Sequence, residues 1–204
     1  MPEKLKLHGA KIPLFPGVEE WFERINRYAS TQNILLEHYI VSSGIEEMIL
    51  GTSIAKHFRH IFGCKYHYDP KSRYAKWPAV AINYTTKTQF IFRINKGVLN
   101  CYNDASVNEY VERERRPVPF DRMIYVGDGD TDIPCMRLVK EQGGCSIAVF
   151  DVDNWYQASS QDKIEKLIAE DRVNYAVPGD YQKNSQLDVM VKGVLRKISR
   201  KASG

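Results

Sequence analysis

The chain lacks long apolar runs, cysteine motifs and a strong excess of either charge. No run of about 18 apolar residues and no signal-peptide pattern occurs, so the sequence predicts neither a membrane span nor secretion. With 29 Lys+Arg against 25 Asp+Glu, the net charge of +4 is too small to predict a nucleic-acid partner, and the basic C-terminal run is interpreted as a solvated helix end. The four cysteines form no C-x-x-C pair and have no histidine at zinc spacing, so we expect reduced thiols in a cytoplasmic protein.

The chain also lacks internal repeats and low-complexity tracts, and its 204 residues are enough for one sizeable core. Residues 1–16 carry three prolines and are predicted to be irregular, whereas residues 17–204 are predicted to form one domain. Helical and strand patterns alternate along that domain, which favours a doubly wound α/β fold with a parallel sheet. The expected helices begin near residues 17, 45, 86, 133, 161 and 185, and the expected strands cover 37–41, parts of 61–84, 123–126, 145–150 and 174–177.

An acidic loop follows one of these strands. The short apolar run Met123–Val126 ends at Gly127, and three aspartates follow it: Asp128, Asp130 and Asp132. Open α/β sheets bind ligands at the carboxyl ends of their strands, and clustered carboxylates suit a hard cation such as Mg2+. The alternative is a solvated Asp/Gly turn with a helix N-cap.

Two further segments could meet this loop at the same sheet edge. Ser42, Ser43 and Gly44 follow an apolar strand, and a serine hydroxyl with free backbone N–H groups at a helix start can bind a phosphate. A simple serine N-cap explains the same pattern. Lys87 lies near the start of a predicted helix, where a positive charge opposes the helix dipole, so it is slightly unexpected as a solvated charge.

Taken in order, Y-I-V-S-S-G, T-T-K-T and V-G-D-G-D-T-D resemble the second, third and fourth motifs of the haloacid dehalogenase (HAD) superfamily, in particular its phosphoserine-phosphatase-like branch. The resemblance extends from about Phe15 to Phe150. It implies a HAD-like, Rossmann-like parallel sheet flanked by helices. It also implies Mg2+-dependent hydrolysis of a small phosphorylated metabolite through an aspartyl-phosphate.

The resemblance also implies roles for individual residues. Ser42, with Ser43 and Gly44, would bind the phosphoryl group, and Lys87 would neutralise its charge and hold the nucleophile. Asp128 would bind Mg2+ directly, and Asp132 would bind the metal ion or orient its waters. Lys87 and Asp132 would thus belong to the catalytic set, while Asp130 occupies a variable place in the motif.

The chain departs from the family in its first motif, D-x-D-x-T or D-x-D-x-V, which supplies the nucleophile. Residues 1–41 contain no aspartate, and the similar string Asp151-Val152-Asp153 follows the fourth motif, where it is interpreted as coincidence. The family's first strand lies between the strands that end here at Ser42 and Gly127, so we expect the sheet to lack its central strand. Residues 1–16 would then be the remnant of a cap or linker segment.

Three explanations of this departure remain open. The chain could be a shortened form of a longer hydrolase, a pseudoenzyme that binds a phosphorylated ligand or a protein partner, or one half of a site completed by a second chain. The last predicts a homo-oligomer, because open strand edges pair readily between chains. For a hydrolase lineage with this incomplete catalytic set, we expect negligible phosphatase activity from this chain alone.

Overall fold

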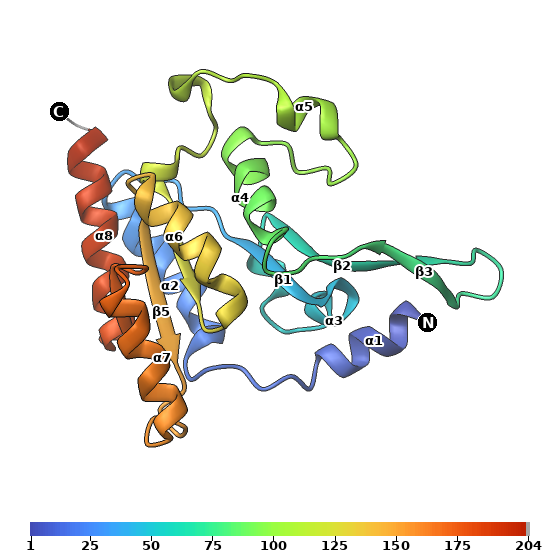
Figure 1. Cartoon of the computed structure of the whole chain (residues 1–204), viewed down its shortest axis with the longest axis horizontal. Helices are drawn as coiled ribbons and strands as arrows, with labels where there is room; N and C mark the ends of the chain where they lie inside the picture. The colour runs from blue at the N-terminus through green and yellow to red at the C-terminus, as the bar shows by residue number, and fades with distance from the viewer. Residues whose placement is uncertain (203–204) are drawn as a thin grey trace.

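The computed structural model of the protein describes residues 1–202 and shows an α/β fold with two small sheets and surrounding helices (Figure 1). The α-helices are α1 (Pro2–Gly9), α2 (Val18–Thr31), α3 (Glu46–Leu50), α4 (Lys87–Lys96), α5 (Asp104–Asn108), α6 (Ile133–Glu141), α7 (Ala158–Ala169) and α8 (Gln186–Ala202). The strands are β1 (Tyr39–Ile45), β2 (His60–Tyr68), β3 (Ala75–Val80), β4 (Ile124–Gly127), β5 (Cys145–Phe150) and β6 (Tyr175–Pro178). Short 3-10 turns are η1 (Ala55–His57), η2 (Arg113–Arg115), η3 (Phe120–Arg122) and η4 (Asp130–Asp132).

Each sheet has three strands. In the first sheet, of order β1-β2-β3, β1 is parallel to β2 and β3 is antiparallel to β2. The second sheet, of order β4-β5-β6, is parallel throughout. The predicted α/β class is therefore confirmed. The prediction of one parallel sheet is met only in part, because the strands form two sheets and the one that contains β1 is mixed. Within the described residues, β1 and β4 each pair with a strand on one side only.

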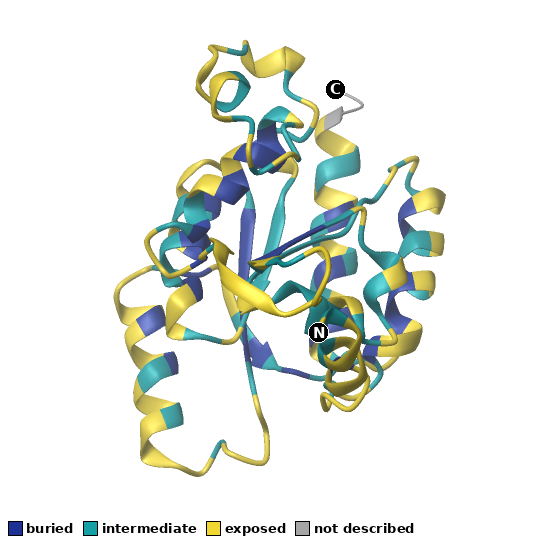
Figure 2. Ribbon diagram, turned by 90° about the vertical axis from the view of Figure 1, so that its right-hand side faces the viewer, coloured by how far each residue is buried: buried dark blue, intermediate teal, exposed yellow. Residues whose placement is uncertain are grey.

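The main core lies between the parallel sheet and helices α2 and α8. The predicted apolar face of α2 is confirmed, since Trp21, Phe22 and Ile25 are buried there against side chains of β5, β6 and α8. Figure 2 shows the buried residues gathered along the inner faces of the helices and the strands that they cover. Burial of large aromatic side chains is the main favourable contribution that a helix of this kind makes to stability.

Helices α4 and α6 connect the two sheets. Ile91 of α4 packs with Cys135 and Val139 of α6, and Val41 of β1 and Tyr125 of β4 pack against the same cluster. The start of α4, the end of β4 and the start of α6 are thereby held close together. This packing positions the candidate site.

The N-terminal segment differs from the prediction of an irregular chain. Pro2 lies in the first turn of α1, where its missing N–H is tolerated, and the helix packs on α3. Glycines permit the close approach: a Cβ at Gly9 would lie 1.8 Å from the Met48 carbonyl oxygen, and one at Gly51 would lie 2.0 Å from that of Lys6. Tertiary packing rather than an apolar pattern explains this helix.

The helix predicted over 45–58 is also wrong in extent. The strand β1 continues through Ser42, Ser43 and Gly44 to Ile45, which pairs with Cys64 of β2. Helix α3 then has 5 residues and ends at Gly51, and a turn and η1 complete the connection. Strand pairing of Ile45 with Cys64 therefore prevails over the helical pattern that predicted a helix from this residue.

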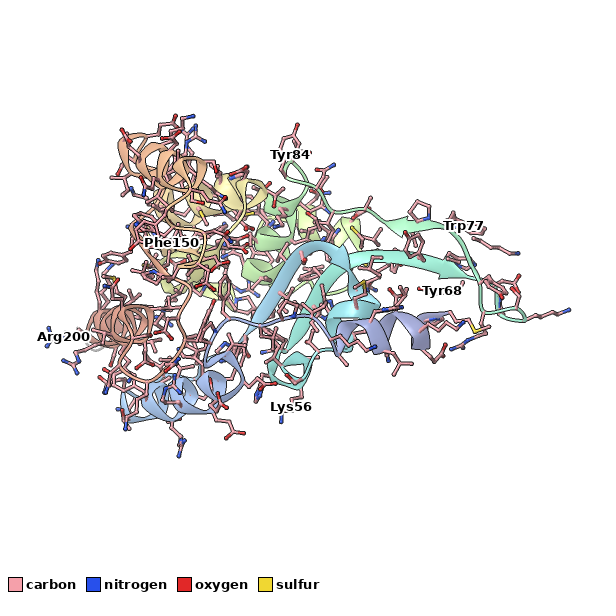
Figure 3. The ribbon with its side chains drawn as sticks, turned by 90° about the horizontal axis from the view of Figure 1, so that it is seen from below. Lys56, Tyr68, Trp77, Tyr84, Phe150 and Arg200 are labelled. Atoms are coloured by element: carbon pink, nitrogen blue, oxygen red, sulfur yellow. The ribbon has the colours of Figure 1, made fainter. Side chains whose placement is uncertain are left out.

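The β-rich segment after residue 61 is confirmed as a hairpin of β2 and β3 that projects from the body (Figures 1 and 3). Asp69 closes its turn by accepting hydrogen bonds from the backbone N–H groups of Lys71 and Ser72. Residues 71–79 are exposed. Among the described helices, none combines the length and apolar character that crossing a membrane requires.

Candidate functional site

Two of the predicted site residues meet in a buried ion pair. Lys87 is the first residue of α4, and Asp132 is the last residue of η4, which lies in the loop between β4 and α6. The Lys87 Nζ lies 2.7 Å from Asp132 Oδ1, and the two side chains are only 6% and 9% exposed. The Lys87 ammonium also donates to Thr131 Oγ1 at 3.2 Å. The helix-start lysine, which opposes the helix dipole, thus has a carboxylate partner.

The Asp132 carboxylate is held by two further donors. Its Oδ1 also accepts a hydrogen bond from the Tyr125 hydroxyl at 2.6 Å, and its Oδ2 accepts one from the Gly129 backbone N–H at 3.1 Å. Hydrogen bonds to an ionised acceptor are short and strong, so these partners fix the carboxylate. In this arrangement Asp132 acts as the anchor of Lys87.

Gly127 is required by the position of that carboxylate. A Cβ added at Gly127 would lie 2.7 Å from Asp132 Cγ and 2.8 Å from its Oδ2. Real Cβ atoms do not approach so closely, because van der Waals contact begins near 3.5 Å. The first glycine of the G-D-G-D-T-D loop therefore serves close packing between the end of β4 and Asp132.

Tyr125 and Cys135 lie next to the ion pair. Burial raises the pKa of Tyr125 strongly, and the adjacent negative charge of Asp132 raises it further, so the phenol is a hydrogen-bond donor at neutral pH. Burial also raises the pKa of the Cys135 thiol to about 11, which keeps it protonated. Sequence reasoning missed Tyr125. The available signal was one hydroxyl inside an apolar strand that leads to an acidic loop.

The other two aspartates of the loop are exposed. The backbone carbonyl of Asp128 accepts a hydrogen bond from Lys163 Nζ at 2.7 Å, and the same ammonium lies 3.1 Å from Asp130 Oδ1. Lys163 comes from α7 and was also missed by sequence reasoning. The pKa of Tyr181 is raised to about 12, mainly by burial and also by the charge of Asp128.

The predicted Mg2+ site is only partly formed by these residues. Within the part of the chain that the structure describes, no three His, Cys, Asp or Glu side chains are grouped so that they could hold a metal ion. Asp132 is engaged by its hydrogen-bond donors, and Asp130 is paired with Lys163. Asp128 alone of the three has a carboxylate without a hydrogen bond or ion pair to a described residue. The residues present therefore do not fit a complete magnesium site by themselves.

The predicted phosphate-binding segment, residues 42–44, makes its hydrogen bonds to residues other than those of the ion pair. Ser42 Oγ accepts a hydrogen bond from the Gly44 backbone N–H at 2.9 Å, and the Ser43 carbonyl accepts one from the Cys64 thiol at 3.3 Å. Between residues 1 and 202, no hydrogen bond joins Ser42, Ser43 or Gly44 to Lys87 or to the aspartates. The helix that follows is too short to contribute a substantial dipole.

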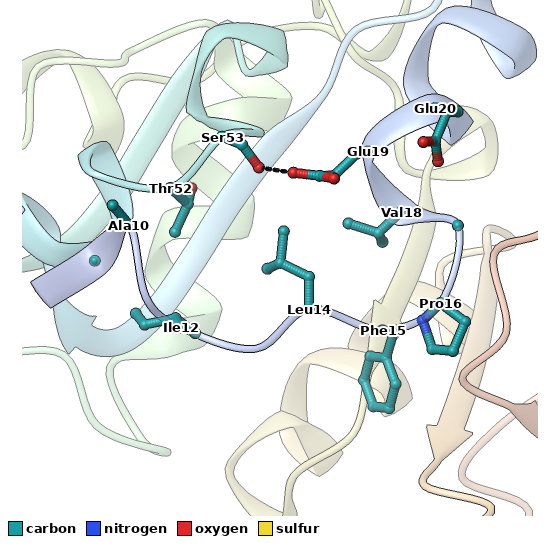
Figure 4. A pocket seen from close by; sticks show the side chains of 12 residues that line it. Ala10, Ile12, Leu14, Phe15, Pro16, Val18, Glu19, Glu20, Thr52 and Ser53 are labelled. Atoms are coloured by element: carbon teal, nitrogen blue, oxygen red, sulfur yellow. Dashed lines mark hydrogen bonds between the residues drawn. The ribbon is translucent and has the colours of Figure 1, made fainter.

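A hollow of about 430 Å³ lies elsewhere, between the segment that links α1 to α2 and the turn after α3 (Figure 4). The side chains of Leu14 and Val18 point into it, and Glu19 accepts a hydrogen bond from the Ser53 hydroxyl across one side. None of the predicted phosphate or metal residues lines it.

No protein-family model matches the chain, and no solved structure matches it. The chain is similar to an uncharacterized protein of Borreliella burgdorferi, with 28% identity over 196 residues. The match covers 88% of this chain and 65% of the relative, so the chain spans less than two thirds of that protein's length.

Proposed function

We propose that this chain is the phosphate- and metal-handling part of a haloacid dehalogenase-type phosphohydrolase and that it lacks the nucleophile. The observation that carries the proposal is the buried Lys87–Asp132 pair at the carboxyl end of β4. Ligands of open α/β folds bind at this edge, and a fixed ammonium there neutralises charge on a transferring phosphoryl group. The order of the three sequence motifs supports the same assignment.

The two sheets support the idea of an absent strand. β5 is buried along nearly its whole length, whereas the apolar strands β1 and β4 contain no fully buried residue. Each also leaves one edge without a strand partner among the described residues, and unpaired backbone groups are costly when they are buried. A strand inserted between β1 and β4 would pair both edges and could carry the missing aspartate. Further polypeptide of the same protein or a second, different chain could supply it.

Each predicted site residue of this chain would then have a separate role in binding the phosphoryl group or Mg2+. Lys87 would bind and neutralise the phosphoryl group, and Asp132 would hold Lys87 in place. Asp128 would hold Mg2+, which supplies further charge neutralisation, together with carboxylates from outside the described residues. Ser42 would donate its hydroxyl proton to a phosphoryl oxygen once the added strand brings the segments together.

A thermal-melt experiment tests the binding half of this proposal. Millimolar inorganic phosphate with Mg2+ is expected to raise the melting temperature of the chain, because a ligand that binds only the folded state stabilises it. Lys87→Met and Asp128→Ala are each expected to remove this shift. Lys71→Met, at an exposed position of the hairpin, serves as the matched control. The proposal fails if the unsubstituted chain shows no shift.

A non-catalytic phosphate-binding module is the second candidate. The pairing of Lys163 with Asp130 and of Lys87 with Asp132 favours it, because two of the three loop aspartates are then balanced by lysines without a metal ion. Phosphate binding that persists in the longest available form of the protein without any turnover of an aryl phosphate would support this candidate over the hydrolase.

A further inference from the structure

The Tyr125 hydroxyl shares one carboxylate oxygen with the Lys87 ammonium. Tyr125 projects from β4, Lys87 begins α4, and both donate to Asp132 Oδ1, at 2.6 Å and 2.7 Å. The other oxygen, Oδ2, is taken by the Gly129 backbone N–H. The carboxylate thus has a different fixed donor on each oxygen in addition to the lysine.

This division has a mechanical consequence. A carboxylate held only by a flexible lysine can rotate about its last bond and carry the ammonium with it, since that torsion is broad. A rigid phenol from a strand prevents the rotation because it selects Oδ1, and the backbone N–H selects Oδ2. The phenol is neutral, so it adds no charge to the pair.

The lysine also has spare donor capacity. An ammonium has three N–H donors, and two of them find acceptors among the described residues, Asp132 and Thr131. One donor is therefore left for a ligand. Its direction is set by where the other two are held, and hence by the orientation of Asp132.

We propose that Tyr125 is a positioning residue, which locks the Asp132 carboxylate so that the Lys87 ammonium keeps one N–H directed at a bound oxyanion. The identity of that oxyanion as a phosphoryl group rests on the proposed function, whereas the locking of the ammonium does not. The strong upward shift of the Tyr125 pKa keeps the phenol proton in place at neutral and mildly alkaline pH.

The first experiment observes the lysine directly. In 1H–15N NMR spectra at low temperature, an immobilised lysine ammonium gives a slowly exchanging Nζ signal, which Lys87→Met assigns by its loss. Tyr125→Phe is expected to speed hydrogen exchange of this signal about tenfold, equivalent to about 1.4 kcal/mol. Tyr175→Phe, on a half-exposed strand residue whose hydroxyl makes no hydrogen bond to a described residue, is expected to leave the rate unchanged.

An unchanged exchange rate in a folded Tyr125→Phe protein overturns the proposal. If that variant does not fold, 3-fluorotyrosine at position 125 replaces it, since its more acidic phenol is a stronger donor. Slower exchange of the Lys87 signal is then expected, and an unchanged rate again overturns the proposal.

A second measurement separates this inference from the function on which it builds. The dissociation constant for inorganic phosphate is measured by calorimetry and is expected to rise about tenfold in Tyr125→Phe. Faster exchange in a protein that binds no phosphate supports the positioning role and refutes the proposed function. Unaltered phosphate affinity and exchange in Tyr125→Phe refute the positioning role and leave the proposed function standing.

Discussion

The Lys87 ammonium lies 2.7 Å from Asp132 Oδ1, although the two residues are 45 positions apart in the chain. Removing both charges from water costs several kcal/mol, and apolar residues of similar size often stabilise a protein as well as a buried ion pair does. Stability alone therefore explains the pair poorly. Under the proposed function, the pair has a further purpose, which is to fix a positive charge at the end of β4.

Breaking this pair from one side is expected to destabilise the protein strongly. Lys87→Met leaves the Asp132 charge buried and unpaired, so the free energy of unfolding should fall by about 3 kcal/mol. Urea denaturation measures it. The double variant Lys87→Met/Asp132→Leu should recover most of the loss, and Lys71→Met should change it by less than about 0.5 kcal/mol. Equal losses in the single and double variants would contradict the account.

Gly127→Ala tests the close packing at the end of β4. The added Cβ must displace the Asp132 carboxyl group, 2.7 Å away, so we expect a loss of about 1–3 kcal/mol in the free energy of unfolding. Gly193→Ala is the control, because nothing lies within 4 Å of a Cβ at this exposed position of α8. There alanine should stabilise the helix by up to about 1 kcal/mol. Similar effects of the two substitutions would argue against steric packing as the reason for Gly127.

Lys163→Met tests whether the Lys163 ammonium competes with Mg2+ for the carboxylates of the acidic loop. The ion pair with the exposed Asp130 should contribute less than about 1 kcal/mol to stability. Loss of the competing positive charge should nevertheless tighten Mg2+ binding several-fold, as followed by a magnesium titration of the melting temperature. Lys166→Met on the same helix is the control. Weaker Mg2+ binding in Lys163→Met would show instead that the lysine shapes the loop for the metal ion.

The pH dependence of stability should reveal His38. Burial, assisted by the charge of His57, lowers its pKa from 6.5 to about 4. Between these values the unfolded chain binds a proton that the folded chain does not, so stability is present above pH 6.5 and falls as the pH drops toward 4. The loss is at most about 3 kcal/mol. His38→Gln should flatten this part of the profile, whereas His8→Gln, at an exposed position, should not.

Sequence patterns predicted the parts of the fold that depend on local periodicity. The apolar face of α2 and the strand before the acidic loop are both present. Helix α1 was missed because its stability comes from contact with α3 rather than from its own pattern. The helix expected over 45–58 was overestimated because Ile45 is used in strand pairing with Cys64.

Some residues of the candidate site could likewise be predicted from the sequence, and others could not. The meeting of Lys87 with Asp132 could be predicted because ligand loops gather at one edge of an α/β sheet. Tyr125 and Lys163 could not, since their roles depend on side-chain directions in the folded chain. The grouping of Ser42 with these residues stays a prediction, because no hydrogen bond joins them in the described part of the structure.

Under the proposed function, this chain holds one part of a phosphohydrolase site. The most direct test compares this chain with a form extended upstream in its reading frame, using an aryl phosphate and Mg2+ as the assay. We expect no turnover from this chain and measurable turnover from a longer form that carries an aspartate motif on an additional strand. Lys87→Met and Asp128→Ala should each abolish that turnover. Turnover that survives both substitutions, or no turnover from a longer form with such a motif, would contradict the account.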